Sequence, residues 1–133
     1  MKLLDRRSLS FLILAFVSVL VPFAGAAQDK PHVLRTELVG PRSALVLVEY
    51  HTLGTERSLA VRVRDIPLPE ITVATAGGSF VLPLTPGGDG LVVLDSRFGD
   101  RVPVLKEGDS VAILASIRGS TRVLLKGTLK PAS

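Results

Sequence analysis

The C-terminal third of the chain, from Leu91 to Leu129, alternates between short apolar runs and groups of turn residues. Three runs rich in Val, Leu and Ile are separated by Phe98-Gly99-Asp100, by Glu107-Gly108-Asp109 and by Arg118-Gly119-Ser120. Aliphatic residues of this kind fit a pleated, half-buried surface, and Gly, Asp and Ser favour tight turns. The stretch therefore predicts consecutive antiparallel strands at the end of a small β domain.

A stricter alternation occurs in the middle of the chain, where apolar Leu59, Val61 and Val63 alternate with three other residues, Ala60, Arg62 and Arg64. A period of two indicates a strand with one face in the core and one in water. The preceding run, Ala44–His51, shows the same period. We expect the two to form a hairpin whose loop covers Thr52–Arg57.

Further short strands are predicted around these two, and no window outside the N-terminal segment shows helical periodicity. The expected strands cover residues 32–39, 44–51, 59–64, 70–75 and 79–84, followed by the three C-terminal runs. About eight short strands, with turn signals roughly every 8–12 residues, are typical of a sandwich or barrel. We predict an all-β fold, a small antiparallel β-sandwich that is immunoglobulin-like or related.

Prolines refine this prediction at three places. Ile66-Pro67-Leu68-Pro69 cannot be a central strand, because two prolines remove two ladder donors, so it should be a crossing loop. Pro83 predicts that the strand over residues 79–84 lies at a sheet edge. Pro103 lies in an apolar link, residues 102–105, which should cross between strands while Val102 and Leu105 close one end of the sandwich.

The first 26 residues have the organisation of a signal peptide. Lys2, Arg6 and Arg7 form a basic start, Leu9–Phe23 is uncharged and apolar, and Ala24-Gly25-Ala26 has the small residues of a cleavage site. We predict a signal peptide over 1–26, a single β-sandwich domain over 27–133, and a secreted protein, periplasmic or extracellular. The alternative is an uncleaved anchor, for which the apolar run is short.

Composition narrows the choice of partners. Half of the net charge of +4 lies in the first ten residues, and aromatic residues make up only 5%. Nucleic-acid binding, which would favour a basic groove with interleaved aromatics, is therefore not expected. The absence of Cys excludes disulfides, thiolate metal sites, a Cys nucleophile and a lipoprotein anchor.

The pattern of turns and core positions resembles that of small secreted bacterial β-domain proteins of unknown function. The resemblance depends on Glu49-Tyr50, the alternating strand 59–63, the Leu-Pro loop 66–69, and the segment from Asp95 to Val111 with its Gly-Asp turns. The chain departs from such proteins at Glu70-Ile71, where they usually have Gly and Tyr. The resemblance implies a β-sandwich and secretion, and it transfers no catalytic residue.

Candidate sites for metal or acid–base chemistry are sparse. The two histidines, His32 and His51, could contribute to a zinc or copper site with a carboxylate, and Glu49 with His51 could form an acid–base pair. Loop carboxylates could bind calcium, although Asp beside Gly is an ordinary turn former; these are Asp89, Asp95, Asp100 and Asp109. We favour the structural interpretation throughout and assign no catalytic, metal or cofactor site.

One possible binding surface is a basic strip of Arg57, Arg62 and Arg64, joined by Arg97 or Arg101. Such a strip could dock an acidic polymer or partner. We therefore expect a non-enzymatic binding or structural module at the cell envelope, which binds protein or cell-envelope polymer. The alternative is a small metal-binding protein or hydrolase that uses His51, Glu49 and a loop Asp. Neither the ligand, the oligomeric state nor the sheet order follows from the sequence.

Overall fold

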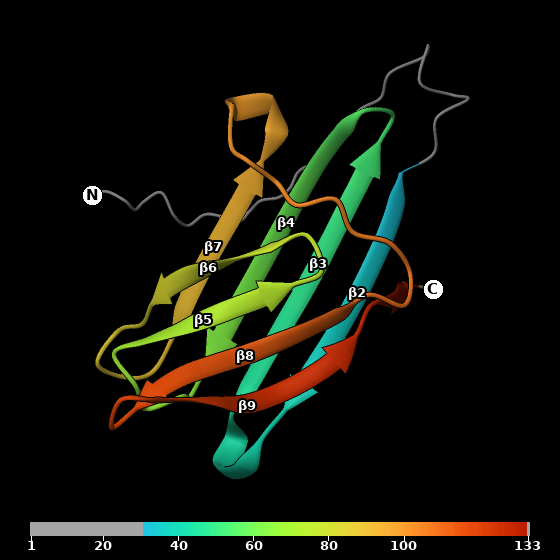
Figure 1. Ribbon diagram of the computed structural model, residues 1–133. Helices are drawn as coiled ribbons and strands as arrows, with labels where there is room; N and C mark the ends of the chain where they lie inside the picture. Colours follow the sequence, from blue (N-terminus) through green and yellow to red (C-terminus); the bar gives the residue numbers. More distant parts are fainter. Residues whose placement is uncertain (1–30, 133) are drawn as a thin grey trace. The chain divides into compact units, whose positions relative to one another are not determined.

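The computed structural model describes residues 31–132, and the predicted signal peptide over 1–26 lies outside this range. Two antiparallel sheets face each other across a common core (Figure 1). The strands are β2 (His32–Val39), β3 (Leu45–Leu53), β4 (Glu56–Arg64), β5 (Glu70–Thr75), β6 (Gly78–Pro83), β7 (Gly90–Asp95), β8 (Ser110–Ile117), β9 (Ser120–Thr128) and β10 (Lys130–Pro131). Two 3-10 turns complete the described elements, η3 (Pro41–Ser43) and η4 (Ser96–Phe98).

The five-stranded sheet has the order β10-β2-β3-β4-β7, and the four-stranded sheet has the order β6-β5-β8-β9. This confirms the all-β, two-sheet prediction, with the very short β10 as a strand beyond the expected eight. The first three described strands share one sheet, whereas an immunoglobulin domain changes sheet after its second strand. No helix within residues 31–132 is long and apolar enough to cross a membrane.

The core lies between the sheets and follows the predicted alternation. Leu59, Val61 and Val63 on β4 are at most 1% exposed, while Arg62 and Arg64 on the same strand are exposed. The four-stranded sheet contributes side chains such as Val73 and Ile113, which are fully buried. Burial of this kind is the main favourable contribution to folding, so β4 and its neighbours anchor the domain.

The loop predicted over Thr52–Arg57 is much shorter in the structure. Strand pairing continues to Leu53 and Glu56, which leaves Gly54 and Thr55 between the strands. Gly54 has a φ of 61°, which glycine adopts without strain. The prediction was wrong because the end of the hairpin is polar and exposed. A polar sequence indicates that residues are not buried, but such residues can still be paired in strands.

The first of the three C-terminal runs does not pair with the second. β7 pairs with β4 at the edge of the five-stranded sheet, and the chain then crosses to the other sheet to form the β8–β9 hairpin. Expecting three consecutive paired strands was therefore wrong. The crossing link itself is confirmed, because Val102 and Leu105 are 4% and 6% exposed and belong to the core.

The prolines lie where the sequence predicted. Residues 66–69 connect β4 in one sheet to β5 in the other, and β6, which ends at Pro83, is an edge strand. At the opposite edge, Gly127 of β9 passes so close to β2 that a Cβ atom there would collide with the side chain of Leu38. This close approach allows the chain to leave β9 and pair as β10 with β2.

Candidate functional site

The three arginines of the predicted basic strip do not share one face. Arg62 and Arg64 point outward from the five-stranded sheet, on the opposite side of β4 from buried Leu59. Arg57 is two residues from Leu59 and therefore lies on the same, inner face of β4. It points toward the end of the sandwich, where its Nη2 donates to the carbonyl oxygen of Val102 at 3.4 Å. Only Arg62 and Arg64 therefore remain together as an exposed basic pair.

The two histidines lie on opposite faces of the five-stranded sheet. His32 is paired with Thr52 and shares the inner face of β2 with buried Leu34, whereas His51 lies opposite Val33 on the outer face. Within residues 31–132, no group of three or more His, Asp or Glu side chains is arranged to hold a metal ion. The sheet itself thus separates the two imidazoles that a histidine metal site would need together.

The candidate acid–base residues do meet, on the open outer face of the sheet. His51 Nε2 donates to Glu49 Oε1 at 3.4 Å, and Arg35 Nη2 lies 2.9 Å from Glu49 Oε2. The hydrogen bond from His51, helped by the charge of Arg35, holds the pKa of Glu49 below its usual range although partial burial opposes this. The side chains of His51 and Glu49 are 45% and 31% exposed, so they form a surface cluster.

The four loop aspartates act as hydrogen-bond acceptors for turns. Asp89 Oδ1 accepts from the backbone N–H of Asp65 at 3.2 Å, and Asp109 Oδ2 accepts from that of Lys106 at 2.9 Å. Asp95 and Asp100 lie on either side of η4. Side chains of this type replace missing backbone partners in turns, which is the structural role expected from the sequence.

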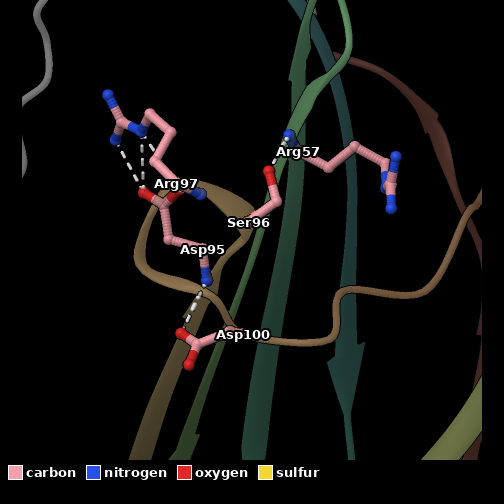
Figure 2. A network of polar contacts seen from close by, with 5 residues as sticks. All are labelled: Arg57, Asp95, Ser96, Arg97 and Asp100. Carbon is pink, nitrogen blue, oxygen red and sulfur yellow. Dashed lines mark hydrogen bonds and ion pairs between the residues drawn. The ribbon is translucent and has the colours of Figure 1, made fainter.

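The densest network of polar contacts surrounds η4, directly after β7 (Figure 2). Asp95 is 7% exposed and is the only buried charged residue within residues 31–132. Its Oδ1 accepts from the backbone N–H of Arg97 at 2.9 Å and from Arg97 Nε at 3.0 Å, while Oδ2 accepts from Arg97 Nη2 at 2.6 Å. The carboxylate thus caps the turn and also holds the guanidinium in a two-point contact.

The base of the turn is closed by Asp100. Asp100 Oδ2 accepts from the backbone N–H of Asp95 at 2.9 Å, and the backbone N–H of Asp100 donates to the carbonyl of Asp95 at 3.3 Å. Ser96 Oγ accepts from the backbone N–H of Arg57 at 2.9 Å, which fixes the turn to β4. Gly99 has a φ of 85° and ends the turn in a left-handed conformation. Both ends of η4 are thereby anchored.

The electrostatics of the pair support the same arrangement. Burial raises the pKa of the Asp95 carboxyl group, but the hydrogen bonds and charge of Arg97 outweigh it, so that the pKa lies below its ordinary value. The hydrogen bond to Asp95 raises the pKa of Arg97. Both groups are therefore charged across the physiological range, and the ion pair holds the turn together.

Phe98 lies at the tip of this anchored turn and is 79% exposed. Its ring lies 5.8 Å from the guanidinium carbon of Arg97. Tyr50 is buried and Phe80 packs against the core, so Phe98 is the only exposed Phe or Tyr within residues 31–132. Val104, 69% exposed, belongs to the crossing link that follows. The turn therefore presents an aromatic ring beside a cation to solvent.

Sequence reasoning treated Phe98-Gly99-Asp100 only as an interruption between strands and missed Phe98 as a candidate. A signal was present: a large aromatic residue lies among Asp, Ser, Gly and Arg, in a turn where burial is not expected. Exposure of a single apolar residue is common, but Phe is enriched in the core of protein interfaces, so Phe98 is a candidate contact residue.

No protein-family model, no curated protein and no solved structure matches this chain.

Proposed function

We propose that this protein is a secreted, non-enzymatic binding module of the cell envelope that recognises a protein partner through the η4 turn. The single observation that supports the proposal most is Phe98, 79% exposed on a turn anchored at both ends. Phe and Arg are both enriched in protein interfaces, and Arg is also among the residues that contribute most of the binding energy. A turn that is already ordered also loses little conformational entropy when it binds.

The neighbouring side chains fit the same proposal. Arg97 is fixed by Asp95 and its side chain remains 52% exposed, so its cationic edge can contact a partner beside the ring. Arg101 follows in the chain and is exposed. An aromatic anchor flanked by cations favours a partner with an apolar pocket and an acidic rim. Export and envelope location are part of the proposal and are supported by the N-terminal sequence pattern.

Site-specific photo-crosslinking in cells that produce the protein tests the proposal. A benzoyl-phenylalanine placed at position 98 should capture a discrete protein, and the same group at position 39 should not. Val39 is a suitable control because it is 69% exposed and lies on β2, away from η4. Capture of the same species from both positions, or of none from position 98, would contradict the proposal.

A second candidate is binding of an acidic envelope polymer by Arg62 and Arg64. They lie two residues apart on the outer face of β4 and are both exposed, as such a surface requires. Retention of the protein on purified acidic envelope polymer would then depend on these two arginines. Loss of retention in an Arg62→Ser, Arg64→Ser variant, with Phe98→Ala unaffected, would favour this candidate over the η4 turn.

Acid–base or metal chemistry at Glu49 and His51 is the competing functional class. The pair lies on an open sheet face with its hydrogen bond at 3.4 Å, where water has access to both groups. We favour a binding function over acid–base or metal chemistry because many short hydrogen bonds hold the η4 turn, whereas few contacts hold the Glu49–His51 cluster. Hydrolytic activity lost on His51→Ala would reverse this preference.

A further inference from the structure

We propose that two copies of this protein pair through the outer edge of β7, extending the five-stranded sheet across a two-fold axis. β7 is the last strand of that sheet, next to β4 (Figure 1). An edge strand exposes unpaired backbone N–H and C=O groups, to which another strand can bind. The inference concerns a different surface from the η4 tip and does not depend on the function proposed above.

β7 is the least protected of the sheet edges in the described part of the chain. β6 ends in Pro83, β10 has only two residues including Pro131, and β9 carries exposed Arg122 and Lys126 and a register shift. Prolines, charges, bulges and short length are the usual means of blocking edge-to-edge association. β7 has none of them between Gly90 and Leu94.

The outer face of this edge is also apolar. Leu91 and Val93 are 44% and 56% exposed, and their side chains lie on the same face because they are two residues apart. Their neighbours across β4 are Arg62 and Ala60. A second β7 would place apolar side chains against these two. The one charged residue of β7, Asp95, is already ion-paired with Arg97 of its own copy.

The direction of the backbone groups follows from Asp95. Its N–H and its C=O both bond to Asp100, so both point away from β4. In an antiparallel ladder the two groups of one residue point to the same side, and the side alternates along the strand. The groups of Leu91 and Val93 therefore also face the outer edge, and residues 31–132 provide no hydrogen-bond partner for them.

This short row of exposed groups selects one register. If the two-fold axis passes through Val92, Leu91 of one copy pairs with Val93 of the other, and every outward-facing group of these two residues gains a partner. If the axis passes through Val93 instead, Leu91 lies opposite Asp95, whose groups are already bonded to Asp100. Antiparallel self-pairing centred on Val92 therefore gives a hydrogen-bond partner to every outward-facing backbone N–H and C=O group of Leu91 and Val93.

The charge test uses a pair of matched valines. Val93 and Val81 are both 56% exposed, and both lie on edge strands, β7 and β6, with their side chains on an outer sheet face. We expect sedimentation equilibrium of the purified protein to show a dimer for the wild type and for Val81→Lys, and a monomer for Val93→Lys. A wild-type monomer at every concentration, or a Val93→Lys dimer as strong as the wild type, would overturn the proposal.

The register test uses the absence of native cysteine. Directly opposed residues in a non-hydrogen-bonded pair have Cα atoms about 4.5 Å apart, within the reach of a disulfide. Val92→Cys should therefore form a disulfide-linked dimer on mild oxidation. Val93→Cys should not, because diagonal neighbours are roughly 7–8 Å apart. Crosslinking at position 93 without crosslinking at position 92 would overturn the proposed pairing.

Discussion

Asp95 and Arg97, two residues apart, are joined by three hydrogen bonds from the guanidinium Nε and Nη2 atoms to both carboxylate oxygens, at 2.6 to 3.2 Å. The same carboxylate accepts from the backbone N–H of Arg97. One buried side chain thus fixes both the backbone of the turn and the direction of the cation beside Phe98.

Removal of the Asp95 carboxylate should loosen the turn without unfolding the domain. We expect Asp95→Ala to lower the free energy of unfolding by about 1–2 kcal/mol, a modest value because Arg97 is half exposed and solvent screens its charge. Glu37→Ala, at an exposed carboxylate on β2, should change it by less than about 0.5 kcal/mol. Urea unfolding of both variants measures the difference, and equal values would show that Asp95 contributes no more than a surface charge.

The Asp95–Arg97 pair should also make stability depend on pH. The pKa of Asp95 in the folded protein lies below its ordinary value of 3.8, so the folded state holds its proton less readily than the unfolded state. The stabilisation is therefore complete above about pH 4 to 5 and is lost as pH falls through the folded pKa. Asp95→Asn should show a smaller loss over this range in thermal unfolding, and an unchanged pH profile would contradict the assignment.

The crossing link offers a test of core packing with an adjacent control. Leu105 is 6% exposed and Val104 is 69% exposed. Leu105→Ala should lower the free energy of unfolding by about 2–4 kcal/mol because it leaves a cavity. Val104→Ala should lower it by less than about 0.5 kcal/mol. If chemical denaturation gave the two variants equal stability, the link would not close the end of the sandwich.

Tyr50 should contribute to the same link through its hydroxyl group. Tyr50 is 1% exposed, and its hydroxyl oxygen accepts from the backbone N–H of Leu105 at 3.2 Å. Tyr50→Phe leaves that buried donor without its partner, which should cost about 1–2 kcal/mol of stability. Faster amide exchange at Leu105 should accompany the loss, and an exchange rate equal to that of the wild type would contradict the hydrogen bond.

Much of the fold could be predicted because the alternation of apolar and polar residues along a strand indicates which side chains are buried. Leu59, Val61 and Val63 alternate with polar residues, and the structure buries all three. The partner of β7 could not be predicted in the same way. An apolar strand fits either sheet equally well, so burial alone does not specify that the chain changes sheet between β6 and β7 and again between β7 and β8.

The site was less accessible from the sequence than the fold. The predicted basic strip grouped Arg57 with Arg62. The alternation of side chains along a strand places Arg57 on the face of buried Leu59 and Arg62 on the opposite face, so the two could have been separated from the sequence. Phe98 was missed because turn residues were interpreted only as breaks between strands. The turn that carries Phe98 is fixed by hydrogen bonds from backbone N–H groups to the carboxylates of Asp95 and Asp100. The spacing of these residues in the sequence does not specify those bonds.

The affinity of the protein partner captured at position 98 for three variants tests the central claim most directly. Titration calorimetry should give a dissociation constant at least about thirtyfold higher for Phe98→Ala than for the wild type, as expected for a hot-spot residue. Val39→Ala, at a position on β2 that is also highly exposed, should bind like the wild type, and Asp95→Ala should be intermediate. Equal affinities for Phe98→Ala and the wild type would contradict the claim that the η4 turn is the binding element.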